Sequence, residues 1–253
     1  MEKRLIFCAG QTKAARFAAT YLQQLGLPVT DRPTDKAAYL LLDVPSFEPS
    51  GSLRLGGSVD HLLGQLPDDT IVYGGNLSHP ALAGYKTIDL LKDEHYLAEN
   101  AYITAECALD VAMPYLKITL RGCPVLILGW GRIGKCLGQL LQACSADVTI
   151  AARKASDRAM LRALGYHAVD IAQITQTLSH YRLIFNTIPA PVLNRDQMAF
   201  CRSDCVKIEL ASQNGMDGDD IIIARGLPGL HLPESSGELI AKTFLRYYQE
   251  ASL

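Results

Sequence analysis

The stretch "LILGWGRIGKCLGQLLQ" (residues 126–142) decides the fold, because a glycine-rich turn in it joins an apolar strand to an amphipathic helix. Its glycines have the G-x-G-x-x-G spacing of dinucleotide-binding turns. In such turns the first glycine permits the tight bend, the second lets the backbone approach a pyrophosphate, and the third lets the helix lie close to the strand. The helix N-terminus then offers N–H groups to the anion. A tight turn that binds no ligand is the alternative. The cofactor-binding residues predicted here are Gly129, Gly131, Arg132, Ile133 and Gly134.

A pair of cations follows the next predicted strand, "DVTIAA" (147–152). NAD-preferring Rossmann sites carry Asp or Glu near this point, where the carboxylate accepts a hydrogen bond from the ribose 2′-hydroxyl. This chain has Arg153 and Lys154 instead. A guanidinium and an ammonium attract a 2′-phosphate, and Arg can hold it with two hydrogen bonds. We therefore predict NADP(H) as the cofactor, with solvation of a strand end as the alternative role of the two cations.

The segment "FNTIPAPVL" (185–193) ends a later strand, and strand ends of this kind line the ligand crevice of a Rossmann sheet. Thr187 offers a hydroxyl and Pro189 stiffens the loop, so both are predicted to lie beside the nicotinamide ribose. An ordinary strand-to-loop junction is the alternative for this segment.

Apolar strands alternate with amphipathic helical patterns along the whole chain, which predicts an α/β fold with parallel sheets in two domains. Residues 117–233 are predicted to form an NAD(P)-binding Rossmann domain. Residues 1–92 and 234–253 are predicted to form a smaller, flavodoxin-like α/β domain for substrate or partner. That domain is discontinuous because the amphipathic final helix needs a partner surface. A long helical pattern over residues 93–116 is the predicted link between the two domains.

Composition excludes several classes of protein. The 253 residues carry a formal net charge of −2, which gives no electrostatic reason to expect nucleic acid or an anionic membrane as a partner. No apolar run reaches the ~18 residues that span a bilayer. The seven cysteines lack the paired spacing of a zinc site, so we expect reduced thiols and no metal. The N-terminal sequence lacks a signal-peptide pattern, and a cytoplasmic location is expected.

With these features established, the chain resembles the dipicolinate synthase A family (dipicolinic acid synthetase A) of spore-forming bacteria over most of its length. Its dinucleotide turn and the Ala-Arg pair after the next strand fit the family pattern. The other segments that carry the resemblance are "DDTIVYGGNLSHP" (68–80), "ENAYITAECAL" (99–109), "IFNTIPAPVL" (184–193), "IELASQNG" (208–215) and "ARGLPGLHLPESSGELIA" (224–241). The last two are the more specific, because generic Rossmann enzymes do not carry them.

The resemblance implies oxidation of dihydrodipicolinate to dipicolinate during sporulation, with NADP⁺ as the acceptor. It also implies a flavoprotein-like second subunit, the dipicolinate synthase B protein, which completes the enzyme. The protein must then orient the ring against the cofactor, exclude water and bind two carboxylates. The sequence does not fix the oligomeric state, and a homodimer is one option.

The chain departs from the family pattern at several positions. Gln213 and Asn214 stand where the family has Lys-Pro, Ser235 stands where it often has Lys, and Cys107 replaces a Gly. The Lys of the family pattern is therefore absent at Gln213 and Ser235, which matters if that Lys binds a substrate carboxylate. The resemblance therefore predicts the fold and the cofactor more directly than it predicts the substrate.

Few residues are candidates for contact with substrate. Glu106, on the predicted linking helix, is the candidate base, and a surface or capping Glu is the alternative. Hydroxyl groups could donate hydrogen bonds to a carboxylate, although serines near a helix start often act only as caps. The predicted substrate-binding residues are Thr104, Ser212, Ser235 and Ser236.

Two other functions remain open from the sequence. A 2-hydroxy-acid dehydrogenase shares the two-domain plan, but it needs an Arg for the substrate carboxylate and a His–acid pair for the proton. This chain has Ala211 and Ser212 where that Arg would be expected. The second alternative is a nucleotide-binding subunit that is inactive without its partner, or one that only senses NADP(H).

Overall fold

A computed structural model of the chain describes residues 4–48 and 50–250. The chain divides into two compact units, and the divisions fall between Asn100 and Ala101 and between Leu227 and Pro228. Each unit is built around one parallel sheet, which confirms the predicted α/β class. The first unit therefore combines residues before and after the second unit. The domain limits predicted from the sequence, and the role of residues 93–116 as a link, stay predictions.

The first unit has a five-stranded parallel sheet in the order β2-β1-β3-β4-β5, which is the flavodoxin-like order. Its strands are β1 (Leu5–Cys8), β2 (Val29–Thr30), β3 (Ala37–Leu41), β4 (Ile71–Gly74) and β5 (Thr87–Asp89). One face of this sheet packs on a cluster of aliphatic side chains contributed by the segment around α2 (Val59–Leu63). The other face is covered by two helices.

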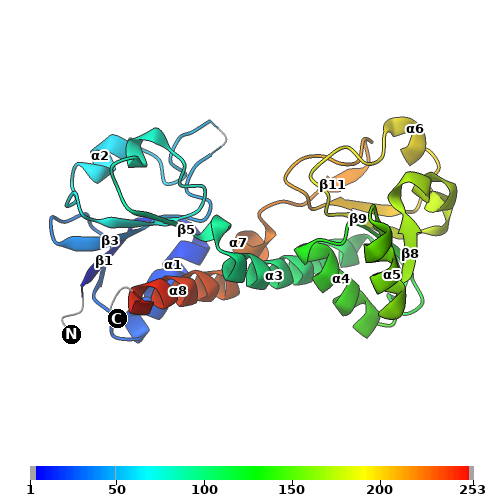
Figure 1. Cartoon of the computed structure of the whole chain (residues 1–253), viewed down its shortest axis with the longest axis horizontal. Helices are drawn as coiled ribbons and strands as arrows, with labels where there is room; N and C mark the ends of the chain where they lie inside the picture. The colour runs from blue at the N-terminus through cyan, green and yellow to red at the C-terminus, as the bar shows by residue number, and fades with distance from the viewer. Residues whose placement is uncertain (1–3, 49, 251–253) are drawn as a thin grey trace. The chain divides into compact units, whose positions relative to one another are not determined.

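These two helices, α1 (Lys13–Gln24) and α8 (Pro233–Glu250), lie side by side (Figure 1). Gly237 allows the close approach, because a Cβ at this position would lie 2.5 Å from the carbonyl oxygen of Ala14. On the sheet side of α8, the Phe244 ring lies 4.6 Å from the Tyr73 ring, centroid to centroid. The apolar side of the final helix is thus buried within the first unit.

A buried carboxylate ties the start of α3 (Glu94–Ala112) to α8. Asp93 is 8% exposed, and its Oδ1 accepts a hydrogen bond of 2.7 Å from the backbone N–H of Tyr96, which caps the helix. Its Oδ2 accepts hydrogen bonds from the guanidinium of Arg246 and the hydroxyl of Tyr247. Burial alone would raise the pKa of Asp93, but these donors and the Arg246 charge outweigh it and lower the pKa to about 2.

This cluster should make stability depend on pH in the acid range. The folded pKa of Asp93 lies below the unfolded value, so its contribution is fully present above about pH 4 and is lost as pH falls toward 2. The Asp93→Asn variant should therefore be less stable by about 2 kcal/mol at neutral pH, with the difference shrinking below pH 4. Chemical denaturation followed by circular dichroism measures this. The same change at exposed Asp69 is the control, and equal pH profiles for the two variants would contradict the assignment.

The second unit has a six-stranded parallel sheet in the order β8-β7-β6-β9-β10-β11, which is the Rossmann order when the strands are numbered within the unit. Its strands are β6 (Pro124–Leu128), β7 (Asp147–Ala152), β8 (His167–Asp170), β9 (Leu183–Asn186), β10 (Val206–Glu209) and β11 (Ile221–Ile223). Helices α4 (Arg132–Ala143) and α5 (Ala155–Ala163) cover one face of this sheet (Figure 1). The opposite face packs on η4 (Ile171–His180) and α6 (Arg195–Met198).

Short elements complete the chain. They are the 3₁₀ turns η1 (Pro80–Leu82), η2 (Leu90–Lys92) and η3 (Met113–Tyr115), and the helix α7 (Leu227–His231). Within the part of the chain that the structure describes, no helix has both the length and the apolar character needed to traverse a bilayer.

Candidate functional site

Two glycines of the turn after β6 are required by its geometry. Gly129 has φ +106°, in the region that favours glycine, and a Cβ there would lie 2.6 Å from Oγ1 of Thr187. A Cβ on Gly134 would lie 2.4 Å from the carbonyl oxygen of Gly129. The tight bend and the close approach of α4 that the spacing predicts are therefore both present.

The middle glycine instead leaves open space at the N-terminus of α4. Gly131 is the N-cap residue, with an ordinary φ of −80°, and no atom lies within 4 Å of the position of an added Cβ. Because the N-cap residue is a glycine, it supplies no side-chain hydrogen bond to the start of the helix. A helix N-terminus without a cap attracts anions, because its first N–H groups have no partner within the helix. The turn thus has the shape and polarity to receive a pyrophosphate.

The equivalent place in the first unit is filled by the protein itself. Thr12 caps α1, and the carboxylate of the buried Asp43 accepts hydrogen bonds from the backbone N–H groups of Gln11 and Thr12, both at 3.0 Å. It also accepts a bond of 2.6 Å from the Thr12 hydroxyl. Asp43 follows β3, so an internal anion occupies the point between β1 and β3 where flavodoxin-like sheets bind phosphate. Of the two helix N-termini, only that of α4 is left for an external anion.

The carboxyl end of β7 carries the two predicted cations. Arg153 and Lys154 are exposed, and their side chains form no ion pair with any residue that the structure describes. Arg158 holds the backbone beneath them, because its guanidinium donates to the carbonyl oxygens of Ala152 at 2.9 Å and Arg153 at 2.7 Å. Arg158 also pairs with Asp170 at 2.9 Å. Asp170, the carboxylate at the end of the neighbouring strand, is therefore already paired with Arg158. Arg153 and Lys154 remain available to a ligand.

A buried polar network organises the ends of β9 and β10. Glu209 is fully buried, and one of its oxygens accepts hydrogen bonds from Asn186 Nδ2 at 2.7 Å and from the N–H of Ala211 at 3.1 Å. The other oxygen accepts from the N–H groups of Gly215 at 2.8 Å and Met216 at 3.2 Å. Four donors thus satisfy the carboxylate, and they fix the loop that follows β10 against the end of β9.

Thr187 and Pro189, the residues predicted beside the nicotinamide ribose, lie on the loop after β9. The Thr187 hydroxyl donates to the carbonyl oxygen of Leu128 at 2.9 Å, so its proton is used to join β9 to β6. Its oxygen can still accept a hydrogen bond from a ligand. Pro189 is exposed. Both residues stand at the carboxyl edge of the sheet, the same edge as the glycine-rich turn.

The predicted substrate residues are divided between the two units. Thr104 is buried and Glu106 exposed on the part of α3 that belongs to the second unit, and Ser212 is exposed on the loop after β10 of that unit. Ser235 and Ser236 belong to the first unit, in the first turn of α8, where Ser235 is exposed and Ser236 buried. Both serines lie inside the helix, which begins at Pro233, so neither is its N-cap residue.

Residues important to the geometry were absent from the sequence prediction, namely Asn186, Glu209, Arg158 and Asp43. A signal for two of them existed. Asn186 and Glu209 are the final residues of otherwise apolar or buried strands, "LIFN" and "VKIE", and both are fully buried. A polar side chain at that position of a parallel strand faces the ligand edge of the sheet. The prediction favoured the neighbouring hydroxyl groups instead.

The buried network supports a prediction about stability. The Glu209→Gln variant places an amide donor where four donors already converge, so at least one buried N–H loses its acceptor, at a cost of about 2 kcal/mol. We expect a lower denaturant midpoint, followed by the fluorescence of Trp130, the only tryptophan in the sequence and a residue of the second unit. The same change at exposed Glu106 should leave the midpoint unaltered. Equal midpoints for the two variants would show that the Glu209 charge is not needed.

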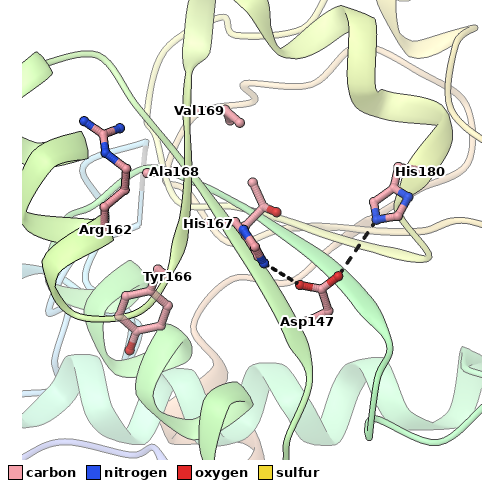
Figure 2. Close-up of a pocket in the computed structure, with 8 residues that line it drawn as sticks. Asp147, Arg162, Tyr166, His167, Ala168, Val169 and His180 are labelled. Carbon is pink, nitrogen blue, oxygen red and sulfur yellow. Dashed lines mark ion pairs between the residues drawn. The ribbon is translucent and has the colours of Figure 1, made fainter.

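A separate pocket of about 420 Å³ lies at the opposite edge of the second sheet, at the amino ends of β7 and β8. Figure 2 shows the Asp147 carboxylate flanked by two imidazoles, with Nε2 of His167 at 3.3 Å and Nε2 of His180 at 4.0 Å. No group of three or more His, Cys, Asp and Glu among the described residues could hold a metal ion. The pocket is not part of the crevice at the carboxyl edge.

Comparison with known proteins adds an independent observation. No protein-family model matches the chain. The dipicolinate synthase A protein of Bacillus subtilis (strain 168) is 24% identical over 178 residues, which cover 67% of this chain and 60% of that protein. The crystal structure of the dipicolinate synthase A protein from Bacillus halodurans superposes with a TM-score of 0.83 at 21% identity, over 97% of both chains. The predicted resemblance to the dipicolinate synthase A family is confirmed.

The likeness to the dipicolinate synthase A proteins in three dimensions establishes the fold over nearly the whole chain. In sequence, the match spans about 60% of the length of the Bacillus subtilis protein. A transhydrogenase from Sinorhizobium meliloti shares the fold more distantly, with a TM-score of 0.75 at 13% identity over 98% of this chain and 94% of that one. The fold is therefore one that the dipicolinate synthase A proteins have in common with that enzyme.

Proposed function

We propose that this chain is an NADP-dependent oxidoreductase subunit that oxidises dihydrodipicolinate to dipicolinate in the cytoplasm of a sporulating cell. The observation that carries the proposal is the uncapped N-terminus of α4 beside two exposed cations, within a fold like that of the dipicolinate synthase A proteins. The substrate is taken from the resemblance to those proteins. The cofactor class is supported by the geometry of the turn.

The cofactor residues fit this role. The backbone around Gly131 would bind the pyrophosphate, and Arg153 with Lys154 would bind a 2′-phosphate on the adenosine ribose. Thr187 and Pro189 would border the nicotinamide ribose. A bound nicotinamide supplies the hydride acceptor, and the protein's task is to orient the ring and exclude water.

The proposed substrate residues are one carboxylate and four hydroxyl groups. Exposed Glu106 would take the proton that leaves the ring as the hydride departs, which requires the ionised carboxylate. Thr104, Ser212, Ser235 and Ser236 are the residues proposed to bind substrate, because their hydroxyl groups can donate hydrogen bonds to a carboxylate. Aromatisation of the ring favours the products. We also propose that a flavoprotein-like second subunit is the partner.

The test is an assay of dipicolinate formation by its ultraviolet absorbance. NADP⁺ and dihydrodipicolinate are supplied to this chain by itself, to the flavoprotein-like partner by itself and to both together. Product formed only when both proteins are present supports the proposal. Turnover of a 2-hydroxy acid by this chain without a partner would instead indicate that the chain is a 2-hydroxy-acid dehydrogenase. Binding of NADP(H) without turnover in any pairing would mean a nucleotide-binding subunit or sensor.

A further inference from the structure

Two cysteines lie together at the amino end of β10, on the edge of the second sheet away from the glycine-rich turn. Cys201 ends the turn that follows α6, where its N–H donates to the carbonyl oxygen of Met198 at 3.0 Å. Cys205 immediately precedes β10, and its N–H donates to the carbonyl oxygen of Arg202 at 3.1 Å. The tight turn between them brings both cysteines against one apolar cluster, with Cys205 buried and Cys201 partly exposed.

The turn itself is fixed by polar contacts. Nε of Arg202 donates to Oδ1 of Asp204 at 2.8 Å, and Nη1 of Arg182 pairs with the other oxygen of Asp204 at 3.3 Å. These contacts hold the segment between the cysteines on the protein surface. The turn that carries the two cysteines is thus held in place by these ion pairs.

The two thiols, which pack on the same apolar cluster, differ in acidity. The neighbouring Cys205 side chain lowers the pKa of Cys201 against the opposing effect of burial, and the Cys205 thiol itself donates to the carbonyl oxygen of Val206 at 3.7 Å. The nearby ammonium of Lys207 also lowers the pKa of Cys201. The neighbouring Cys201 side chain and burial raise the pKa of Cys205. The accessible sulfur is therefore the better nucleophile, and the buried one keeps its proton.

We propose that Cys201 and Cys205 form a reversible intramolecular disulfide when the chain meets a low-molecular-weight disulfide. The Cys201 thiolate attacks one sulfur of the reagent, forms a mixed disulfide and releases one thiolate. The Cys205 sulfur then attacks Cys201 and gives up its proton to solvent, and the second half of the reagent leaves as a thiolate. Two protein thiols are oxidised and one small disulfide is reduced to two thiols, which balances the exchange.

The sequence makes the product easy to identify. Trypsin cleaves after Arg195, Arg202 and Lys207, so the two cysteines fall on different peptides, residues 196–202 and 203–207. The full chain is incubated with glutathione disulfide, its remaining thiols are alkylated, and a tryptic digest is analysed by mass spectrometry without reduction. We expect the two peptides to be joined, the count of free thiols to fall from seven to five, and dithiothreitol to restore all seven.

Single variants separate this pair from the other thiols. In Cys201→Ser the joined peptides should be absent, whereas Cys144→Ser, which removes an exposed thiol, should leave them unchanged. In Cys205→Ala, Cys201 should stop at the mixed disulfide with glutathione. The proposal is overturned if the wild-type chain also stops at the mixed disulfide, or if the linked peptides contain any other pair of cysteines.

Discussion

The Gly131→Val variant is expected to lose dinucleotide affinity by more than about 100-fold while its thermal midpoint stays close to that of the wild type. The reason is the open space above the N-terminus of α4. No atom lies within 4 Å of the added Cβ position, and the φ of −80° suits any residue, so the fold accepts the side chain. A bound pyrophosphate would need that same space, because its oxygens must reach the first N–H groups of the helix.

The third glycine of the turn provides the matched contrast. In Gly134→Ala the new methyl group would meet the Gly129 carbonyl oxygen at 2.4 Å, so α4 has to move away from β6. This variant should lose thermal stability, which Gly131→Val should not. Calorimetric titration with NADP⁺ and thermal unfolding measure the two effects. An unchanged affinity in Gly131→Val would show that the turn does not hold the nucleotide.

The Arg153→Ala variant is expected to weaken binding of NADP⁺ by about 10- to 100-fold and binding of NAD⁺ by much less. A hydrogen bond between charged groups contributes roughly 1.5–3 kcal/mol, and only NADP⁺ carries the 2′-phosphate that would receive it. The Arg153 guanidinium has no partner in the described protein, so its removal exposes no buried charge and should not disturb the fold.

Arg162→Ala is the control for Arg153→Ala. Arg162 is an exposed arginine of the helix that follows Arg153, α5, but it lines the pocket at the amino ends of β7 and β8, where no dinucleotide is expected. Its removal should alter neither affinity. Titration of both variants with both coenzymes gives the four affinities needed. Equal losses of NADP⁺ and NAD⁺ binding in Arg153→Ala would mean that this residue does not discriminate between them.

The features predicted correctly from the sequence are those that short segments encode. The strands around the glycine-rich turn follow directly from apolar runs ended by glycine or polar residues, and the parallel sheet follows from their alternation with helices. The geometry of Gly129 and Gly134 is local as well, because the bend and the helix start lie within one short turn. The residues that would contact the ligand remain predictions.

Other features could not be predicted because their partners are distant in sequence. Asp43 fills the N-terminus of α1 from 31 and 32 residues away, and Glu209 meets Asn186 across 23 residues. Such pairs depend on which strands become neighbours, and the strand order is a tertiary property. The two-residue strand β2 is likewise too short to have a periodicity that a sequence pattern could reveal.

The Asp43 carboxylate at the N-terminus of α1 affects the number of coenzyme molecules that one chain is expected to bind. A chain with two doubly wound sheets would ordinarily be expected to bind two nucleotides. In the first unit, however, the Asp43 carboxylate already occupies the position where a phosphate would bind. Saturation of the chain should therefore require a single molar equivalent of coenzyme, with no second, weaker phase at higher concentration.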